Sequence, residues 1–205
     1  IILRNQLSEQ PSIAPYFVEE IRKYLEEKYG AKQLYENGLS VETSLDYELQ
    51  MAANRALDEG LRRLDKRRGW RRPGRNVLAE GGRIDTFSVD RWSRPIGVGD
   101  IVPAVVVAVS GSSRTAGDRR ALPPGGARVR VGTYRGDLLR DAVAWTGRAS
   151  AAGLVKPGDL IEVRVTKVDE ATGTIGCALE QEPIVEGALL AIDHHTGQIL
   201  SLIHI

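Results

Sequence analysis

The sequence predicts an α+β fold in which a small β-barrel is inserted between an amphipathic helical segment and a β-hairpin. Three observations predict it. Residues 46–68 repeat apolar side chains at helical spacing, residues 187–202 hold two apolar runs around a turn, and the region between them contains short β-branched runs bounded by glycine. An amphipathic helix and a lone hairpin each need a partner surface. We therefore expect the two outer segments to pack together, with the middle region inserted as a separate domain.

Residues 1–38 are expected to be an inter-domain linker that contains one helix. Residues 1–13 are polar, and we expect them to be extended. Pro15 suits a first helical turn, the apolar residues after it recur at helical spacing, and Gly30 ends the pattern, so a helix is predicted over 15–29. Its opposite face is dense in Glu and Lys, which favours a solvated face with spaced ion pairs over a partner surface. Residues 31–38 are expected to be a connector.

Residues 39–70 are expected to form a strand followed by a helix. Leu39 to Thr43 alternates apolar and polar residues, which predicts a strand. Asp46 is the expected N-cap of the helix, because a short carboxylate can accept hydrogen bonds from the first turn. Arg67, Arg68 and then Gly69 are typical of a helix end.

Residues 71–183 are expected to form the inserted domain. Long or alternating β-branched runs predict strands over 101–109, 127–131, 160–168 and 174–179, and residues 110–126 have the composition of a mobile loop. Several short strands with glycine-rich turns, and no helical period of comparable strength, are typical of a small closed barrel. An OB-like fold is the predicted architecture.

The end of the chain, 184–205, is expected to open a further domain with a hairpin. Residues 187–192 are almost continuously apolar, Asp193 to Gly197 has turn chemistry, and residues 198–202 return as a second strand.

Three segments resemble the class A penicillin-binding proteins. Residues 38–46 read GLSVETSLD and are followed by Leu49-Gln50 and Ala52-Ala53, similar to the family's Gly-Leu-x-Val-x-Thr-Thr-Leu-Asp-x-x-Leu-Gln-x-Ala-Ala. Residues 14–19 resemble the segment after the family's glycosyltransferase domain, and residues 181–200 resemble the opening of its transpeptidase domain. Ser44 replaces a second Thr, and residues 201–205 depart from the family's small and Gly-Gly continuation. We place no functional weight on the final three residues.

The resemblance implies a non-catalytic fragment of a bifunctional peptidoglycan synthase, which polymerises glycan strands from lipid-linked precursor and cross-links them at D-Ala-D-Ala stems. It implies an extracytoplasmic, periplasmic location with a membrane anchor upstream of Ile1, since no run here approaches the roughly twenty apolar residues of a membrane span. The fragment is then a spacer between two active sites. Cell-wall synthesis regulators or activator proteins are the expected partners of the OB-like domain.

The candidate docking surface of the inserted domain consists of Arg128, Arg130, Tyr134, Arg135 and Trp145. The same residues support the alternative of an RNA-binding OB domain, because residues 156–179 also resemble the last strands of RNA-binding ribosomal OB domains. Residues 71–182 carry 17 basic and 13 acidic residues, a modest net charge of +4, and the whole chain carries +1. The basic stretch around Trp70 is similarly expected to be a charged boundary in which Trp70 packs as a plug. We therefore expect no nucleic acid.

The sequence predicts no catalytic, cofactor or metal residues. The family's Ser-x-x-Lys, Ser-x-Asn and Lys-Thr-Gly pattern does not occur, and its glycosyltransferase glutamates would lie upstream of Ile1. His194 and His195 are neighbours on a turn, expected to point in different directions, and no Cys or carboxylate cluster joins them. The single Cys177 cannot form an internal disulfide.

Overall fold

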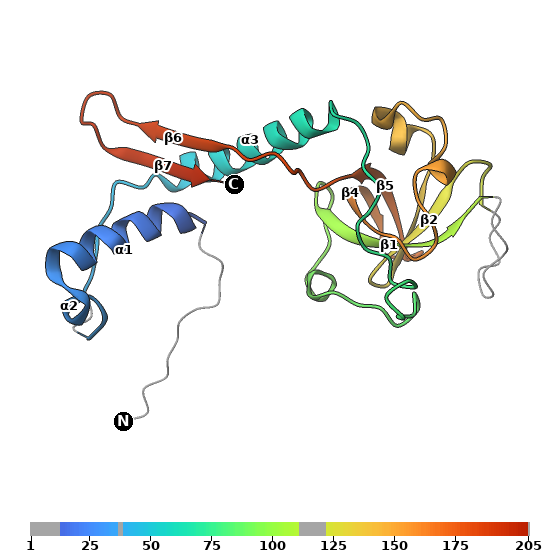
Figure 1. Cartoon of the computed structure of the whole chain (residues 1–205), viewed down its shortest axis with the longest axis horizontal. Helices are drawn as coiled ribbons and strands as arrows, with labels where there is room; N and C mark the ends of the chain where they lie inside the picture. The colour runs from blue at the N-terminus through green and yellow to red at the C-terminus, as the bar shows by residue number, and fades with distance from the viewer. Residues whose placement is uncertain (1–12, 37–38, 111–121, 205) are drawn as a thin grey trace. The chain divides into compact units, whose positions relative to one another are not determined.

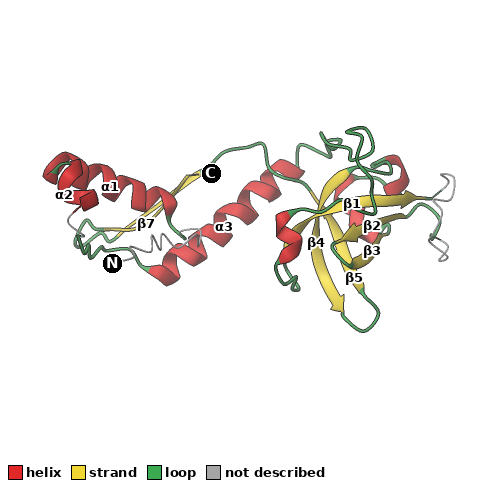
Figure 2. Ribbon diagram, turned by 90° about the horizontal axis from the view of Figure 1, so that it is seen from below, coloured by secondary structure: helices red, strands yellow, loops and turns green. Residues whose placement is uncertain are grey.

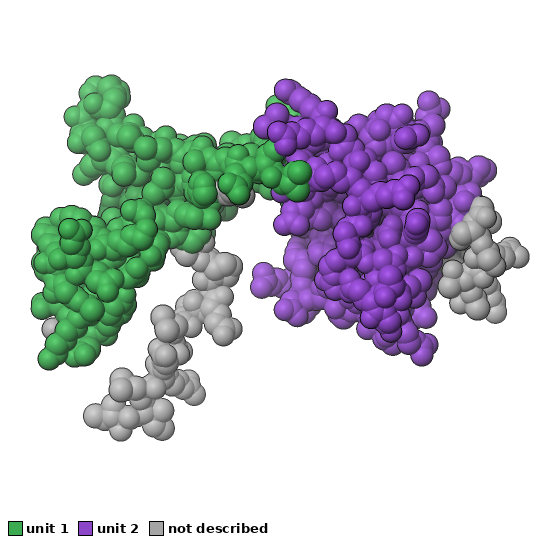
Figure 3. Space-filling view, viewed as in Figure 1, with its two compact units in different colours: residues 1–63, 184–205 green, residues 64–183 purple. Residues whose placement is uncertain are grey.

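The computed structural model describes residues 13–36, 39–110 and 122–204. The chain divides into two compact units, one made of residues 1–63 and 184–205 and the other of Leu64–Pro183 (Figure 3). The second unit is thus interposed in the sequence of the first. It begins earlier than the boundary at residue 71 that the sequence predicts, because the last residues of a helix belong to it.

The first helix, α1 (Pro15–Tyr29), has the bounds that the sequence predicts. Pro15 lies in its first turn, and Gly30 follows with φ of 81°, a backbone conformation that glycine adopts without strain. On its charged face Arg22 pairs with Glu19 at 2.7 Å in a largely exposed ion pair, as expected for a solvated face. The predicted connector is partly wrong, since Ala31–Glu36 forms a short helix, α2.

The predicted strand over 39–43 is wrong, because a strand needs a neighbour along its length. The contacts with a strand come just after this segment, where the Ser44 hydroxyl donates to the Ile199 carbonyl and the Asp46 N–H to the Leu200 carbonyl. The helix that follows is α3 (Tyr47–Lys66). Asp46 Oδ1 accepts from the Leu49 N–H at 2.9 Å, which confirms the predicted N-cap.

The hairpin consists of the antiparallel strands β6 (Ala188–Ile192) and β7 (Ile199–His204). It lies beside α3 (Figure 1). Gln50, buried on α3, accepts from the Ser201 hydroxyl at 2.8 Å and from the Leu202 N–H at 3.2 Å through the same amide oxygen. The predicted packing of helix and hairpin is confirmed.

The second unit contains a closed five-stranded barrel (Figure 2). Its strands are β1 (Ile101–Val109), β2 (Ala127–Val131), β3 (Tyr134–Leu138), β4 (Leu160–Asp169) and β5 (Thr174–Glu180), in the order β1-β2-β3-β5-β4. The pairs are antiparallel except β3 with β5, which is parallel and joined at Arg135 and Thr174. Inward side chains such as Val129, Leu138 and Leu179 are fully buried and form one core.

The sequence predicts four of these strands and misses β3. Its five residues read Tyr-Arg-Gly-Asp-Leu, so a glycine and two charged residues interrupt the alternation of apolar and polar side chains that would indicate a strand. Gly136 is required there, since a Cβ would lie 2.9 Å from both Cys177 Sγ and the Ile175 carbonyl oxygen on β5. The predicted loop 110–126 falls mostly outside the described residues. The described part of the unit also contains three short 3-10 helices: η1 (Asp90–Ser93), η2 (Asp141–Thr146) and η3 (Ala151–Gly153).

Candidate docking face and base of the barrel

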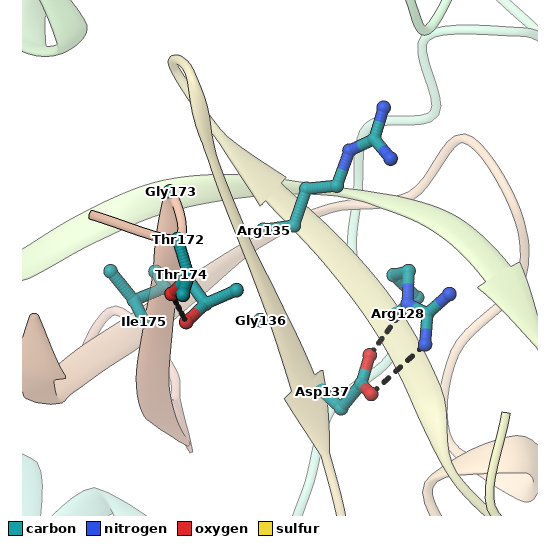
Figure 4. A pocket seen from close by; sticks show the side chains of 8 residues that line it. All are labelled: Arg128, Arg135, Gly136, Asp137, Thr172, Gly173, Thr174 and Ile175. Carbon is teal, nitrogen blue, oxygen red and sulfur yellow. Dashed lines mark hydrogen bonds and ion pairs between the residues drawn. The ribbon is translucent and has the colours of Figure 1, made fainter. Parts of the chain in front are cut away.

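Arg128 and Arg135 line one pocket on the outside of β2, β3 and the start of β5 (Figure 4). The pocket has a volume of about 400 Å³, and residues 172–175 form its other side. Arg128 is only 4% exposed, and Asp137 accepts from its Nε at 2.7 Å and from its Nη2 at 3.0 Å. This pairing neutralises the Arg128 charge, so Arg128 orders the face more than it attracts ligands.

Arg135 extends away from the Arg128–Asp137 pair and is exposed (Figure 4). Across the pocket the hydroxyls of Thr172 and Thr174 lie 2.8 Å apart. An exposed guanidinium can bind a carboxylate or another hydrogen-bonding anion.

Arg130 and Tyr134 line a second pocket, between the β2–β3 hairpin and residues 85–96. Arg130 is held by the backbone, because its guanidinium donates to the carbonyls of Gly132 at 3.0 Å, Phe87 at 2.7 Å and Ile84. It also lies over the Trp92 ring, with 4.9 Å from Cζ to the ring centroid. Burial lowers the pKa of Arg130 from its usual value.

Trp145 lines neither pocket. Its Nε1 donates to the Leu179 carbonyl at 2.8 Å, and its ring meets that of Trp70 edge to face at 5.9 Å between centroids. Trp70 also donates to the Leu154 carbonyl, which places it in the plug position that the sequence predicts. The structure therefore does not bring Trp145 together with the other four candidate residues.

The two ends of the barrel unit are joined by a polar cluster that the sequence did not reveal. Asp65 is completely buried, and Arg71 Nη1 donates to its two carboxylate oxygens at 2.8 and 2.7 Å. Gln181 donates to Asp65 Oδ2 at 2.7 Å and to the Gly69 carbonyl at 3.1 Å, and accepts from the Arg71 N–H at 3.1 Å. Arg71 further donates to the Glu182 carbonyl at 2.6 Å. We call Asp65, Arg71 and Gln181 the base cluster.

A second set of charges flanks the base cluster. Glu180, 3% exposed, pairs with Lys66 at 2.7 Å and with Arg164 at 3.2 Å, and Lys66 lies 5.2 Å from the Trp145 ring centroid. Lys66 and Glu180 are 114 residues apart in sequence, and nothing in the sequence around either residue distinguishes it from an ordinary surface charge. No periodicity or motif could have signalled that they meet.

Among the described residues, no group of three or more His, Cys, Asp or Glu side chains is placed to hold a metal ion. The expectation that His194 and His195 point in different directions is wrong, because their ring centroids lie 3.6 Å apart on the hairpin turn. In the part of the chain that the structure describes, no helix is both long and apolar enough to cross a membrane.

No protein-family model matches the sequence. Curated relatives do match it: the chain is 28% identical over 215 residues to penicillin-binding protein 1A of Rickettsia typhi, an alignment that covers 98% of this chain and 23% of the relative. It is 30% identical over 194 residues to penicillin-binding protein 1A of Neisseria lactamica, covering 93% of this chain and 22% of the relative. The chain thus spans less than a quarter of the length of these relatives.

The fold is also similar to that in a crystal structure of penicillin-binding protein 1A from Haemophilus influenzae. The TM-score is 0.66 and the sequence identity 22%, over 93% of this chain and 25% of that one. At this identity the likeness concerns the mixed α and β fold with its closed barrel.

Proposed function

Because this chain is homologous over nearly its whole length to a segment of the class A penicillin-binding proteins, we propose that it serves as the non-catalytic spacer and docking module of a bifunctional peptidoglycan synthase. The parent enzyme would polymerise glycan strands from lipid-linked precursor and cross-link them at D-Ala-D-Ala stems. It would act on the periplasmic side of the inner membrane. The barrel would separate the two active sites and receive regulatory proteins.

The base cluster is the observation that carries this proposal. It hydrogen-bonds the backbone and side chains of residues 65–71 to those of residues 181 and 182, so the chain enters and leaves the barrel at one place. A domain with adjacent ends can be inserted in another domain without separating the segments on either side of it. This arrangement suits a module whose work is separate from catalysis.

We infer that the barrel is OB-like, because a small closed barrel of five strands is typical of that fold. On the outside of β2 and β3, Arg128 and Arg135 line one pocket, and Arg135 is exposed there. An acidic surface on a regulatory protein would complement it. The relatives and the solved structure described above are all penicillin-binding proteins, so RNA binding has no support.

A deletion in the full-length enzyme tests the spacer and docking role. Residues 72–182 are replaced by a short Gly-Ser linker, which the adjacency of Arg71 and Glu182 allows. We expect fluorescent penicillin to acylate the deletion variant as it does the parent, while cross-linking or its stimulation by regulators changes. Loss of acylation together with the fold would contradict a separable module.

Point variants test the docking role separately from the spacer role. Arg135→Glu reverses the exposed charge on the candidate face, and Arg148→Glu makes the same change at an exposed residue that lines neither pocket. We expect Arg135→Glu to weaken binding of a regulator and Arg148→Glu to leave it unchanged. Equal effects of the two variants would argue against a docking role for this face.

A further inference from the structure

The two units of the chain carry opposite net charges. The barrel unit, Leu64–Pro183, contains 20 basic and 14 acidic residues, a net charge of +6. The other unit contains 8 basic and 13 acidic residues, a net charge of −5. The whole chain is near neutral only because these charges cancel. Such an asymmetry favours binding of the barrel unit to an anionic partner.

Part of the positive charge is concentrated where the chain enters the barrel. Residues 64–75 contain six basic residues and a single acidic one. Three of the six basic residues already have an anionic partner, in the pairs Lys66–Glu180, Arg71–Asp65 and Arg75–Glu80. The carboxylates that these pairs use are therefore committed to other cations.

The remaining three basic residues are Arg67, Arg68 and Arg72, which we call the base arginines. All three are exposed, and none forms an ion pair with a residue that the structure describes. Glu182, whose carbonyl accepts from Arg71, is exposed as well, so this surface carries three positive charges and one negative. The base arginines are thus available to an anion from outside the chain.

The helix dipole accounts for only some of this charge. Arg67 and Arg68 directly follow α3, and cations at a helix C-terminus interact favourably with its dipole. Arg72 lies beyond Gly69, whose φ of 92° ends the helical turn, so it has no such role. None of the three lines either pocket of the barrel, which favours an extended anionic surface over a small ligand.

An exposed apolar side chain accompanies the base arginines. Leu64, on the last turn of α3, is 46% exposed. The Arg68 N–H donates to the Asp65 carbonyl at 2.9 Å, so the helical turn continues and Leu64 shares a side with Arg67 and Arg68. At a bilayer surface, apolar side chains enter the headgroup region while guanidinium groups bind phosphate. Acidic side chains alone would give Leu64 no apolar contact.

We propose that Leu64 and the base arginines bind the surface of a bilayer that contains anionic phospholipid. The choice of a lipid surface rests on the proposed function, which locates the parent enzyme at a membrane. The arginines would contact headgroup phosphates, and Leu64 would enter the layer between them. This contact would hold the entrance of the barrel at the membrane surface.

The test is co-sedimentation of the 205-residue chain with lipid vesicles. One set of vesicles contains phosphatidylcholine and phosphatidylglycerol in equal parts, and the matched set contains phosphatidylcholine alone. We expect binding to the anionic vesicles only, and a strong loss of binding between about 0.05 and 0.5 M salt, because salt screens exposed charges. Equal binding to the two sets, or no binding at low salt, would overturn the proposal.

A triple variant locates the contact. Arg67→Gln, Arg68→Gln and Arg72→Gln together should weaken vesicle binding about a hundredfold, since each arginine near an anionic bilayer contributes about fivefold. The control removes the same charge from three other exposed cations of the barrel unit, as Arg83→Gln, Arg94→Gln and Lys167→Gln. It should lose far less binding. Equal losses in the two triple variants would assign binding to net charge and would overturn the proposed site.

A last variant distinguishes lipid from an acidic protein. Leu64→Gln should weaken vesicle binding by about threefold to tenfold, because an apolar contact is lost. A polyglutamate peptide that binds more tightly than the vesicles, and equally well to Leu64→Gln, would replace the lipid by an acidic protein. Because the replaced side chains are exposed, the urea midpoint from tryptophan fluorescence should match the parent in every variant. Failure here leaves the proposed function standing, since penicillin acylation of the deletion variant tests that function separately.

Discussion

The carboxylate of Asp65, fully buried, accepts hydrogen bonds from neighbours at the two ends of the barrel unit: Arg71 Nη1 at 2.7 Å and Gln181 Nε2 at 2.7 Å. Because Asp65 bonds to residues near both ends, one carboxylate fixes the place where the chain enters and leaves the barrel.

Removing this carboxylate should destabilise the barrel unit. Asp65→Ala removes one acceptor each from the Arg71 guanidinium and the Gln181 amide, which keep the Glu182 and Gly69 carbonyls. Because Asp65 is fully buried and the Arg71 side chain is 34% exposed, the expected loss is about 1–3 kcal/mol. The three tryptophans all lie in the barrel unit, so fluorescence in a urea titration reports its free energy of unfolding.

Glu80→Ala is the matched control for Asp65→Ala. Glu80 pairs with Arg75 at 2.7 Å in the same unit, but both side chains are largely exposed. No measurable change in the urea midpoint is expected. A midpoint for Asp65→Ala that equals the one for Glu80→Ala would show that the base cluster contributes no stability.

Gly136 should not tolerate a side chain. A Cβ would lie 2.9 Å from both the Ile175 carbonyl oxygen and Cys177 Sγ, and the oxygen belongs to the backbone of β5. Gly136→Ala should therefore force β3 and β5 apart and lower the free energy of unfolding by about 2 kcal/mol. Gly153→Ala, where a Cβ meets nothing within 4 Å, should lie near wild type in the same thermal or urea melt.

Cys177 should be unreactive in the folded protein. Burial raises the pKa of its thiol from 9.0 to about 12, so the thiolate is scarce at pH 8. We expect iodoacetamide to modify Cys177 at pH 8 only after urea is added. Rapid alkylation of the native protein would mean that β5 opens readily at this point.

The same shift predicts a loss of stability at high pH. The unfolded thiol ionises near its ordinary pKa and the folded thiol near 12, so the stabilisation is fully present below about pH 9 and falls as the pH rises toward 12. Cys177→Ala should have a flatter stability profile over this interval. Parallel profiles would assign the alkaline loss to other groups.

Arg130→Lys should loosen residues 84–96 although it keeps the charge. One ammonium cannot reach the carbonyls of Ile84, Phe87 and Gly132 together while lying over Trp92. Amide hydrogen exchange over 84–96 should quicken, with a loss of about 1–3 kcal/mol in local stability. Arg135→Lys, at an exposed position, should leave this exchange unchanged.

Local patterns were sufficient to predict the helices α1 and α3, four barrel strands and the hairpin. The cap at Asp46 and the turn at Gly30 follow from side-chain chemistry within a few residues, which a single sequence displays. The strand β3 was not predicted, because its Gly136 is required by packing against β5, and the order of residues in the sequence does not show that contact.

The candidate face was predicted only in part for the same reason. Arg128 and Arg135 share a pocket because β2 and β3 pair in register, whereas Trp145 packs with Trp70, 75 positions earlier in the chain. Alternation indicates which residues share a strand face. It does not indicate which strand ends and helices are brought together by the closing of the barrel.

The base cluster also determines how mechanical tension would pass through the molecule. A pull applied to the chain before residue 65 and after residue 182 is resisted first by the bonds of Arg71 and Gln181, because these bridge the two chain segments directly. While they hold, the strands of the barrel carry no load. Such a bypass would let the barrel remain folded while the chain on either side of it is under tension.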